Sequence, residues 1–337
     1  MEGFQTKTLV TQRSLKYKYY VSTHGTVTTQ TPALFFIHGF PDSAHLWSGV
    51  VAHLCGLPNK MIIPDCLGYA GTDKPDDTRL YAYKDQANDL AEILKKEGAH
   101  CSIIIGHDWG SVLAQRTYLY RPTLFSGVVL LNTGYMIPSE QPFDLDMVNA
   151  ATEKQLGCPQ FSYWEFLTAP DSAEIIDDNL ERMWQVLHGD VRGWMKKLFC
   201  VPNAMREFLT GDEEVPLKPY AAQARWKNNF LQQFKKDGFA SSLQMYKATM
   251  TNVQAASDST IPKEKLRIGV PLLFAICSQD AVCVPDMMTP AKESGLVPYL
   301  KEVVIDCAHW SPMEKPDEIG QCIYNFIKDI KSSGDRY

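Results

Sequence analysis

The sequence predicts an α/β fold in which a mostly parallel sheet is flanked by helices and carries an inserted helical segment. Short continuous apolar runs, such as 33–37 and 102–105, are typical of strands that are buried on both faces. Helical stretches alternate with these runs, and the clearest covers 84–97, where apolar residues share one face. One long interval, from about 136 to 254, is helical and rich in aromatic residues. Strands that alternate with helices indicate the α/β class.

The expected strands follow one another along the chain. An N-terminal pair, 4–11 and 16–24, comes first, and its second member alternates apolar and polar side chains as a half-buried strand does. The buried runs then lie at 33–37, 61–63, 102–105, 127–131, 271–276 and 300–305. After the last run, an amphipathic closing helix carries Ile319, Ile323, Phe326 and Ile330.

The long helical interval divides the chain into a core and a cap. We expect residues 1–135 to form the first part of the core, 136–254 the helical cap and 255–337 the second part of the core. The clearest cap helix is expected to begin near Asp171 and to end at Gly189. An active site is predicted where the core and the cap meet.

Composition and charge exclude several classes of partner. The formal net charge is −6 and no basic cluster occurs, which argues against nucleic acid and anionic lipid as partners. No run approaches the roughly 18 apolar residues of a membrane span, and the N-terminus lacks the apolar region of a signal peptide. The nine cysteines are odd in number and show no C-x-x-C spacing. We therefore expect a cytoplasmic protein whose reduced thiols are small buried hydrophobes. No pattern indicates an oligomeric state.

The strongest motif is the stretch 105–111, Ile-Gly-His-Asp-Trp-Gly-Ser, which leads from a buried strand into a helix. Its small residues are those that a nucleophile elbow requires, and Asp108 lies at the apex. The alternative is an aspartate that caps the helix N-terminus. A carboxylate nucleophile can displace at a saturated carbon to give an ester, which water can then hydrolyse. The expected electrophile is therefore an sp³ carbon.

A second motif, His38-Gly39-Phe40-Pro41, follows the run 33–37. In folds with a nucleophile elbow, two backbone N–H groups point at the same oxygen. One belongs to the third residue of this motif, Phe40, and the other to the residue after the nucleophile, Trp109. The two N–H groups would form an oxyanion hole for the step in which water attacks the Asp108 ester. The alternative is a Gly-Pro turn after a buried strand.

A base and an orienting acid complete the predicted triad. His309 follows the last strand-like run, where the chain order nucleophile, acid, histidine puts the base. Asp280 lies in the loop after the run 271–276 and is the expected acid, although an aspartate in a turn is common. The other site used for this acid holds Asn132, which carries no charge.

These motifs resemble those of the epoxide hydrolases of the α/β-hydrolase superfamily. The matching stretches occur in the family's order: His38-Gly39-Phe40-Pro41, the loop 65–75, Gly106-His107-Asp108-Trp109-Gly110, Asp280 and Cys307-Ala308-His309-Trp310. The resemblance covers essentially the whole chain. It is closest to the hydrolase domain of the soluble epoxide hydrolases, and this chain corresponds to that domain only.

The resemblance also implies two cap tyrosines above the nucleophile, and the matching positions are Tyr163 and Tyr246. Opening an epoxide leaves an alkoxide, and a phenol with a pKa of about 10 can donate a proton to it. Without the family pattern, a tyrosine in an aromatic helical stretch is a packing residue. The neighbours of the motifs are candidates for lining the pocket: His38, Pro41, Phe161, Trp164 and Trp310.

The sequence thus predicts an enzyme that converts a small apolar epoxide and water to a vicinal diol. It has neither a phosphate-binding glycine loop after a strand nor His, Cys and carboxylate residues at metal-ligand spacing, so we expect no cofactor and no metal. The nearest alternative is a haloalkane dehalogenase, which also follows its nucleophilic Asp with Trp and needs N–H donors for the departing halide. A ligand receptor that has lost turnover is the other alternative, but no member of the triad is missing.

Overall fold

The computed structural model describes residues 1–332 of the chain. Within them, eight strands form one sheet in the spatial order β1-β2-β4-β3-β5-β6-β7-β8. The strands are β1 (Phe4–Val10), β2 (Lys16–Ser22), β3 (Ala33–Ile37), β4 (Met61–Pro64), β5 (Ser102–His107), β6 (Phe125–Leu131), β7 (Leu272–Cys277) and β8 (Leu300–Ile305). The predicted α/β fold is confirmed, and each strand begins and ends within two residues of its predicted limits.

The pairing of the strands separates the N-terminal hairpin from the rest of the sheet. β2 pairs antiparallel with β1 and β4, whereas every pair from β4 to β8 is parallel. The central strands β3 and β5 are buried along their whole length. This burial explains their continuous apolar sequences, because both of their faces are covered by helices.

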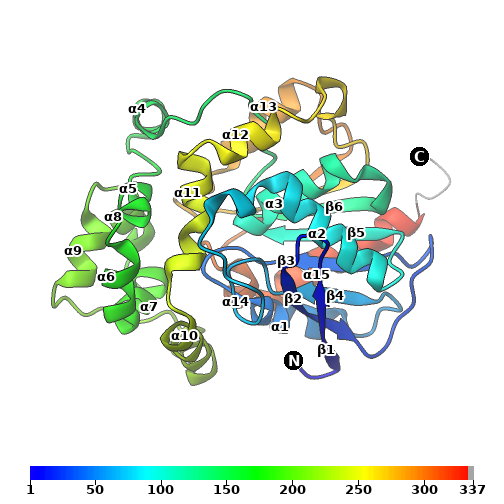
Figure 1. Cartoon of the computed structure of the whole chain (residues 1–337), viewed down its shortest axis with the longest axis horizontal. Helices are drawn as coiled ribbons and strands as arrows, with labels where there is room; N and C mark the ends of the chain where they lie inside the picture. The colour runs from blue at the N-terminus through cyan, green and yellow to red at the C-terminus, as the bar shows by residue number, and fades with distance from the viewer. Residues whose placement is uncertain (333–337) are drawn as a thin grey trace.

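Alternate residues of the central strands contribute to two separate apolar clusters. Leu34 and Phe36 belong to the cluster that includes α1 (Ser48–Leu54) and α15 (Pro316–Ser332). Phe35 and Ile37 belong to the cluster that includes α2 (Tyr83–Lys96) and α3 (Trp109–Tyr120). Because successive side chains point to opposite faces of a strand, each helix pair covers one face of the sheet (Figure 1).

A group of helices is inserted between β6 and β7, to one side of the sheet (Figure 1). These helices are α4 (Leu145–Leu156), α5 (Tyr163–Thr168), α6 (Ser172–Asp178), α7 (Leu180–His188), α8 (Trp194–Phe199), α9 (Ala204–Thr210), α10 (Ala224–Asp237), α11 (Gln244–Met250) and α12 (Val253–Asp258). Two short helices, α13 (Thr289–Glu293) and α14 (Ser311–Glu314), flank β8. The division of the chain at 136 and 254 stays a prediction.

The prediction of a single cap helix from Asp171 to Gly189 was wrong, because two helices, α6 and α7, occupy this stretch. The break is at Asn179, whose backbone is not helical (φ −128°, ψ 37°). Its side-chain amide donates to the carbonyl of Ile175 at 2.8 Å. Asparagine competes in this way for backbone groups, so apolar periodicity alone does not reveal the break.

The cysteines are free, but they are not uniformly buried. Cys66, Cys200, Cys277, Cys283 and Cys307 are buried. Cys55 is exposed, so the prediction of small buried hydrophobes was wrong for this residue. Among residues 1–332, the helices are all too short or too polar to cross a membrane.

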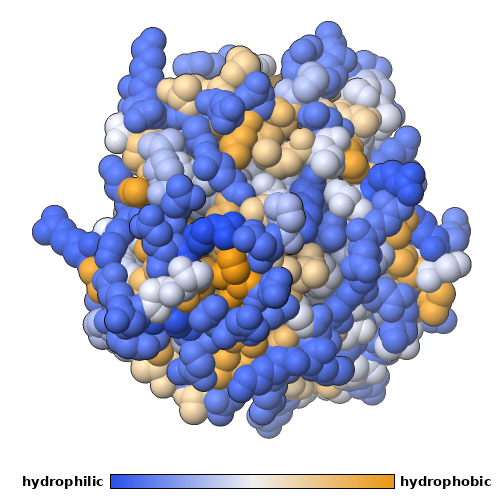
Figure 2. Space-filling model, turned by 60° about the vertical axis from the view of Figure 1, so that its left-hand side comes forward, coloured by the Kyte–Doolittle hydropathy of each residue, from blue (hydrophilic) through white to orange (hydrophobic). Residues whose placement is uncertain are grey.

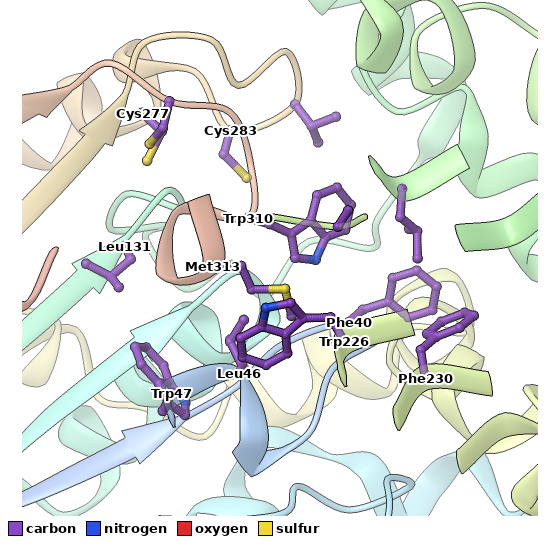
Figure 3. Packing of buried hydrophobic residues seen from close by; sticks show 14 of the residues in the cluster. Phe40, Leu46, Trp47, Leu131, Trp226, Phe230, Cys277, Cys283, Trp310 and Met313 are labelled. Atoms are coloured by element: carbon purple, nitrogen blue, oxygen red, sulfur yellow. The ribbon is translucent and has the colours of Figure 1, made fainter. Parts of the chain in front are cut away.

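Large apolar side chains fill the seam between the sheet and the inserted helices. Phe40, Trp310 and Met313 come from loops and α14 beside the sheet, and Trp226 and Phe230 come from α10 (Figure 3). All five are at most 8% exposed. The seam is thus an extension of the core, which fixes the inserted helices over the carboxyl ends of the parallel strands.

Candidate active site

The junction of β5 and α3 holds Asp108 in a left-handed backbone conformation (φ 55°, ψ −126°). Such a conformation is strained for a non-glycine residue and persists only where the surroundings impose it. A Cβ atom on Gly106 would meet the carbonyl oxygen of Gly110, and one on Gly110 would meet that of Ile37. The small residues of the motif therefore permit this sharp turn. The side chain of Asp108 makes no capping hydrogen bond with α3.

The two carboxylate oxygens of Asp108 have different surroundings. Oδ1 accepts a hydrogen bond from the backbone N–H of Phe40 at 2.8 Å. Oδ2 lies 3.5 Å from Nε2 of His309. Burial alone would raise the pKa of Asp108, but the hydrogen bond and charge of His309, with the backbone N–H of Trp109, lower it. Asp108 is therefore ionised, with Oδ1 bound by the backbone N–H of Phe40 and Oδ2 beside Nε2 of His309.

His309 links Asp108 to Asp280. Its Nδ1–H donates to Oδ2 of Asp280 at 2.7 Å, and because a carboxylate only accepts, this bond fixes the tautomer. Burial would lower the pKa of His309, but the charge of Asp280 and the bonds with both carboxylates raise it well above its ordinary value. Oδ1 of Asp280 accepts from the backbone N–H groups of Val282 and Cys283, both at 2.9 Å. The three predicted triad residues are thus brought together.

A second group of hydrogen bonds supports the triad from behind. The side-chain amide of Asn132 donates to Oδ2 of Asp280 at 2.7 Å and accepts from Oγ of Ser311 at 2.8 Å. The ring of His107 bonds to the carbonyl of His309 at 2.7 Å. The sequence considered Asn132 only as a site for the acid. Asn132 directly follows the core strand β6, and this position was the sequence feature that could have indicated a role in the site.

The two predicted tyrosines come from different inserted helices and lie next to each other. Tyr163 is the first residue of α5, Tyr246 lies in α11, and their ring centroids are 6.0 Å apart. Both side chains are buried, with 7% and 2% exposed. Burial, together with the charge of Asp108, raises the pKa of both phenols. Both phenols therefore stay protonated at neutral pH.

Aromatic rings hold Tyr246 in place. Its ring packs edge-on against Phe40, Trp109 and Trp164, at centroid distances of 5.1, 5.2 and 5.2 Å. Phe161 packs against Trp164 at 5.5 Å. Of the residues expected to line the pocket, Phe161 and Trp164 thus belong to the aromatic group around the tyrosines.

Three features lie together at the ends of the parallel strands: an aspartate of positive φ, a histidine bound to its acid, and a backbone donor to the aspartate. Together they are typical of a nucleophile elbow with its triad. Residues 32–316 match the family model described as alpha/beta hydrolase fold. The chain belongs to the α/β-hydrolase fold family.

Relatives of this α/β-hydrolase carry one recurrent name. Bifunctional epoxide hydrolase 2 of Rattus norvegicus is 28% identical over 303 residues, which are 88% of this chain and 52% of the relative. Epoxide hydrolase A of Mycobacterium tuberculosis is 25% identical over 308 residues, 89% of this chain and 91% of the relative. The chain thus spans about half the length of the mammalian relatives it matches.

Solved structures share the fold. An epoxide hydrolase from an endophytic Streptomyces superposes with a TM-score of 0.79 at 22% identity, covering 98% of this chain and 97% of that chain. An epoxide hydrolase from Vigna radiata gives a TM-score of 0.73 at 21% identity, covering 98% and 99%. The resemblance to epoxide hydrolases that the motifs indicated is confirmed by the relatives and by this fold.

The remaining predicted pocket residues of the α/β-hydrolase lie around the first motif and beside His309. His38 is buried and accepts from the N–H of Cys66 through Nε2 at 2.9 Å, so it braces the loop. Pro41 lines a small cavity below α10. Trp310 packs against His309 with ring centroids 4.9 Å apart.

Asp42 is a polar residue of the site to which the sequence assigned no role, although it directly follows Pro41. Burial and the charge of Asp108 raise its pKa to about 7. The charge of His309 and a contact with the side chain of Trp310 act in the opposite direction and lower this pKa. Asp42 thus adds a carboxyl group that titrates near neutrality beside the triad.

A cleft of about 690 Å³ opens beside His309. The loop between α7 and α8 forms one wall, and the loops that hold Asp280 and His309 form the other. The face that Figure 2 shows, on which the side of the inserted helices comes forward, has hydrophobic side chains within a frame of hydrophilic ones. Of the three triad residues, His309 lines this cleft.

One group of potential metal ligands occurs in the part of the chain that the structure describes. Ligand atoms of Asp280, Cys283 and His309 lie within 4.8 Å of one another. Residue spacing did not reveal this group, because its members come from two loops. Asp280 and His309 are hydrogen-bonded to each other, so the triad already uses two of the three.

Proposed function

We propose that the protein hydrolyses epoxides to vicinal diols through a covalent ester on Asp108. The arrangement that carries the proposal is an ionised carboxylate, Asp108, together with two buried, protonated phenols whose rings lie 6.0 Å apart, Tyr163 and Tyr246. The carboxylate supplies a nucleophile for a saturated carbon, and the phenols supply acids for the ring oxygen. The names of the relatives support the same reaction.

Ring opening uses the free oxygen of Asp108. Oδ2 attacks an epoxide carbon from the side opposite the ring oxygen, so a C–O bond of the ring breaks as the ester bond forms. The ring oxygen takes a proton from Tyr163 or Tyr246. Because burial raises the pKa of both phenols, the proton is present at neutral pH and leaves only as negative charge develops on the substrate.

Ester hydrolysis uses His309 and Asp280. Esterification removes the carboxylate of Asp108, whose hydrogen bond with His309 is one cause of the raised pKa of His309. The pKa of His309 therefore falls, and its ring can be neutral. Neutral His309 takes a proton from water, and the water oxygen attacks Cγ of Asp108. Charge then develops on Oδ1, which the N–H of Phe40 binds at 2.8 Å. The Cγ–Oδ2 bond then breaks, and protonated His309 gives its proton to Oδ2 as the diol leaves. The proton of the hydroxyl that was added to Cγ passes to the phenolate, which restores the phenol and the ionised Asp108.

The proposed substrate is a small apolar epoxide, and water is the second reactant. The aromatic group around Tyr246 and the apolar seam favour an apolar substrate. The proposed steps need no organic cofactor and no metal ion. Unpaired cysteines favour a reducing compartment such as the cytoplasm.

The test is a comparison of product classes. A panel of alkyl and aryl epoxides is assayed for diols, and a matched panel of haloalkanes is assayed for released halide. Diol formation that disappears in Asp108→Ala supports the proposal. No diol from any epoxide, with a folded wild-type protein, refutes it. Halide release would then favour a haloalkane dehalogenase, and release of neither product would favour the non-catalytic receptor.

A further inference from the structure

The loop between β4 and α2, residues 65–82, contains the stretch 65–75 that matched the family pattern, but the proposed reaction does not use it. This β4–α2 loop is tied to the sheet half by its own hydrogen bonds. Oγ1 of Thr72 donates to the carbonyl of Asp65 at 2.7 Å. The carboxylate of Asp65 accepts from the N–H of Ala44 at 3.0 Å, just before α1. The loop is therefore a fixed part of the sheet half.

The β4–α2 loop holds the segment that binds the nucleophile. The N–H of Cys66 donates to Nε2 of His38 at 2.9 Å, and its thiol donates to the carbonyl of His38 at 3.4 Å. The ring of Tyr69 packs edge-on against the ring of His38 at 5.0 Å. In the same segment, the N–H of Phe40 binds Oδ1 of Asp108 at 2.8 Å. The loop thus fixes the backbone that carries this donor.

The same loop also holds the turn that leads into α11. Oγ of Ser241 donates to the carbonyl of Gly68 at 2.7 Å, and the phenol of Tyr69 donates to the carbonyl of Ser242 at 3.1 Å. A Cβ atom on Gly68, whose φ is 92°, would lie 2.8 Å from the carbonyl oxygen of Ser241. Glycine is therefore required for this close approach of the two backbones.

Two further bonds reach the first turn of α11 itself. Oγ1 of Thr78 donates to Oε1 of Gln244 at 2.6 Å. Nε2 of Gln86, which lies in α2, donates to Sδ of Met245 at 3.2 Å. The next residue of α11 is Tyr246. Side chains of the sheet half therefore bind the two residues that directly precede this tyrosine.

The helix that carries Tyr163 is joined to the sheet half at a different place. Nε2 of Gln160, just before α5, donates to the carbonyl of Val282 at 2.5 Å. Val282 lies in the loop that holds Asp280. The two tyrosines thus depend on different loops, so a change in the β4–α2 loop should affect Tyr246 and spare Tyr163.

We propose that Tyr69 and Thr78 are positioning residues for ring opening, because their hydroxyl groups hold α11 so that Tyr246 can donate to the substrate oxygen. Neighbouring rings fix the side chain of Tyr246, whereas these bonds fix the helix that carries it. The ring of Tyr246 also packs on Phe40 at 5.1 Å, so the β4–α2 loop sets the place of the phenol relative to the N–H that binds Asp108. This inference rests on the proposed function, in which Tyr246 is one of two proton donors.

The first experiment measures the two half-reactions separately in Tyr69→Phe, Thr78→Val and the double variant. Each single substitution removes one hydroxyl and nearly keeps the size of the side chain. Each should slow formation of the Asp108 ester by about three- to ten-fold, as expected for loss of one neutral hydrogen bond. Hydrolysis of the ester should keep its rate, because Asp280 and His309 lie in other loops.

A double-mutant cycle shows whether the effect passes through Tyr246. In a Tyr246→Phe background, ring opening depends on Tyr163, so Tyr69→Phe and Thr78→Val should change its rate by less than about two-fold. In a Tyr163→Phe background, where Tyr246 is the remaining donor, both substitutions should keep their full effect. Equal losses in the two backgrounds would mean that the hydroxyls support general stability, and would overturn the proposal.

Hydrogen exchange tests the positioning without any turnover. In the variant that combines Tyr69→Phe and Thr78→Val, the amides of α11 should exchange faster than in wild type, and those of α5 should keep their rate. Tyr135→Phe is the matched control, because this buried phenol also donates to a backbone carbonyl, that of Leu266 at 2.5 Å, and makes no hydrogen bond with α11 among residues 1–332. The control should change neither the exchange nor ester formation.

The outcomes separate this inference from the proposed function. Faster exchange in α11 together with slower ester formation supports the inference. Unchanged exchange in α11 overturns it, whether or not the protein hydrolyses epoxides. Diol formation by wild type with an unchanged ring-opening rate in the loop variants overturns the inference and leaves the epoxide function intact. Absence of diol from wild type refutes the function, and the positioning role for ring opening falls with it.

Discussion

The triad and the tyrosine pair are held in different ways. In the triad, Asp280 accepts four hydrogen bonds, from His309, Asn132 and two backbone N–H groups. In the inserted helices, Tyr163 and Tyr246 are positioned by neighbouring rings at 4.9–6.4 Å. The covalent chemistry thus depends on directional hydrogen bonds, whereas the orientation of the substrate depends on packing.

This difference predicts how strongly substitutions in each region should slow the reaction. A triad member acts only in one orientation, so its loss should stop one chemical step completely. A phenol that is held by packing keeps its place when a neighbour changes slightly, and the second phenol remains to donate. We therefore expect large effects from the sheet half and graded effects from the inserted helices.

The largest effect is expected from His309→Gln. Without the base, ring opening should continue while hydrolysis of the ester falls by about 10³-fold or more, within the range of general base catalysis. The ester should then accumulate, and intact-protein mass spectrometry would detect a mass increase equal to that of the substrate. Normal turnover in this variant would contradict the role of His309.

The tyrosine substitutions should give graded losses. Tyr163→Phe and Tyr246→Phe should each slow ring opening by about 10²-fold, the effect of removing one preorganised donor, and the double variant should abolish it. Pre-steady-state measurement of ester formation checks this order. If the double variant still opens epoxides, the phenols are not the acids, and the comparison between the two regions fails.

Asn132→Gly tests the support behind the triad. The backbone of Asn132 has a φ of 67°, which glycine adopts freely, so the substitution removes the amide without adding strain. Loss of one hydrogen bond to the charged Asp280 should slow ester hydrolysis by about ten-fold. Ring opening should keep its rate, and an equal loss in both steps would indicate a general distortion.

The smallest effect concerns pH. Hydrolysis requires neutral His309, so its rate should rise with pH through the pKa of this residue. Asp42, whose pKa is raised to about 7, adds negative charge above that pH and stabilises the imidazolium. Asp42→Asn should therefore move the acidic limb of the hydrolysis rate to lower pH. A limb that stays in place would show that Asp42 does not act on His309.

The triad could be predicted from the sequence because chain order is sufficient for it. Parallel strands end at one edge of the sheet, so loops after β5, β7 and β8 must meet there, and each carries one polar residue of the expected type. The oxyanion donors follow from the same rule. The tyrosines needed a family pattern, since nothing in their local sequence differs from packing residues.

Other features depend on contacts between distant segments. Asn132 supports Asp280 across 148 positions of sequence, and Ser311 supports Asn132 across 179. The break at Asn179 depends on one side-chain bond to Ile175. Periodicity and motif spacing contain no information on any of these.

A single turnover in ¹⁸O-labelled water tests the covalent mechanism most directly. With enzyme in excess over epoxide, the water oxygen attacks Cγ of Asp108, so the label should appear in the Asp108 side chain and be absent from the diol. Peptide mass spectrometry locates it. Label in the diol with none in Asp108 would mean that water opens the ring directly, and would contradict the ester intermediate.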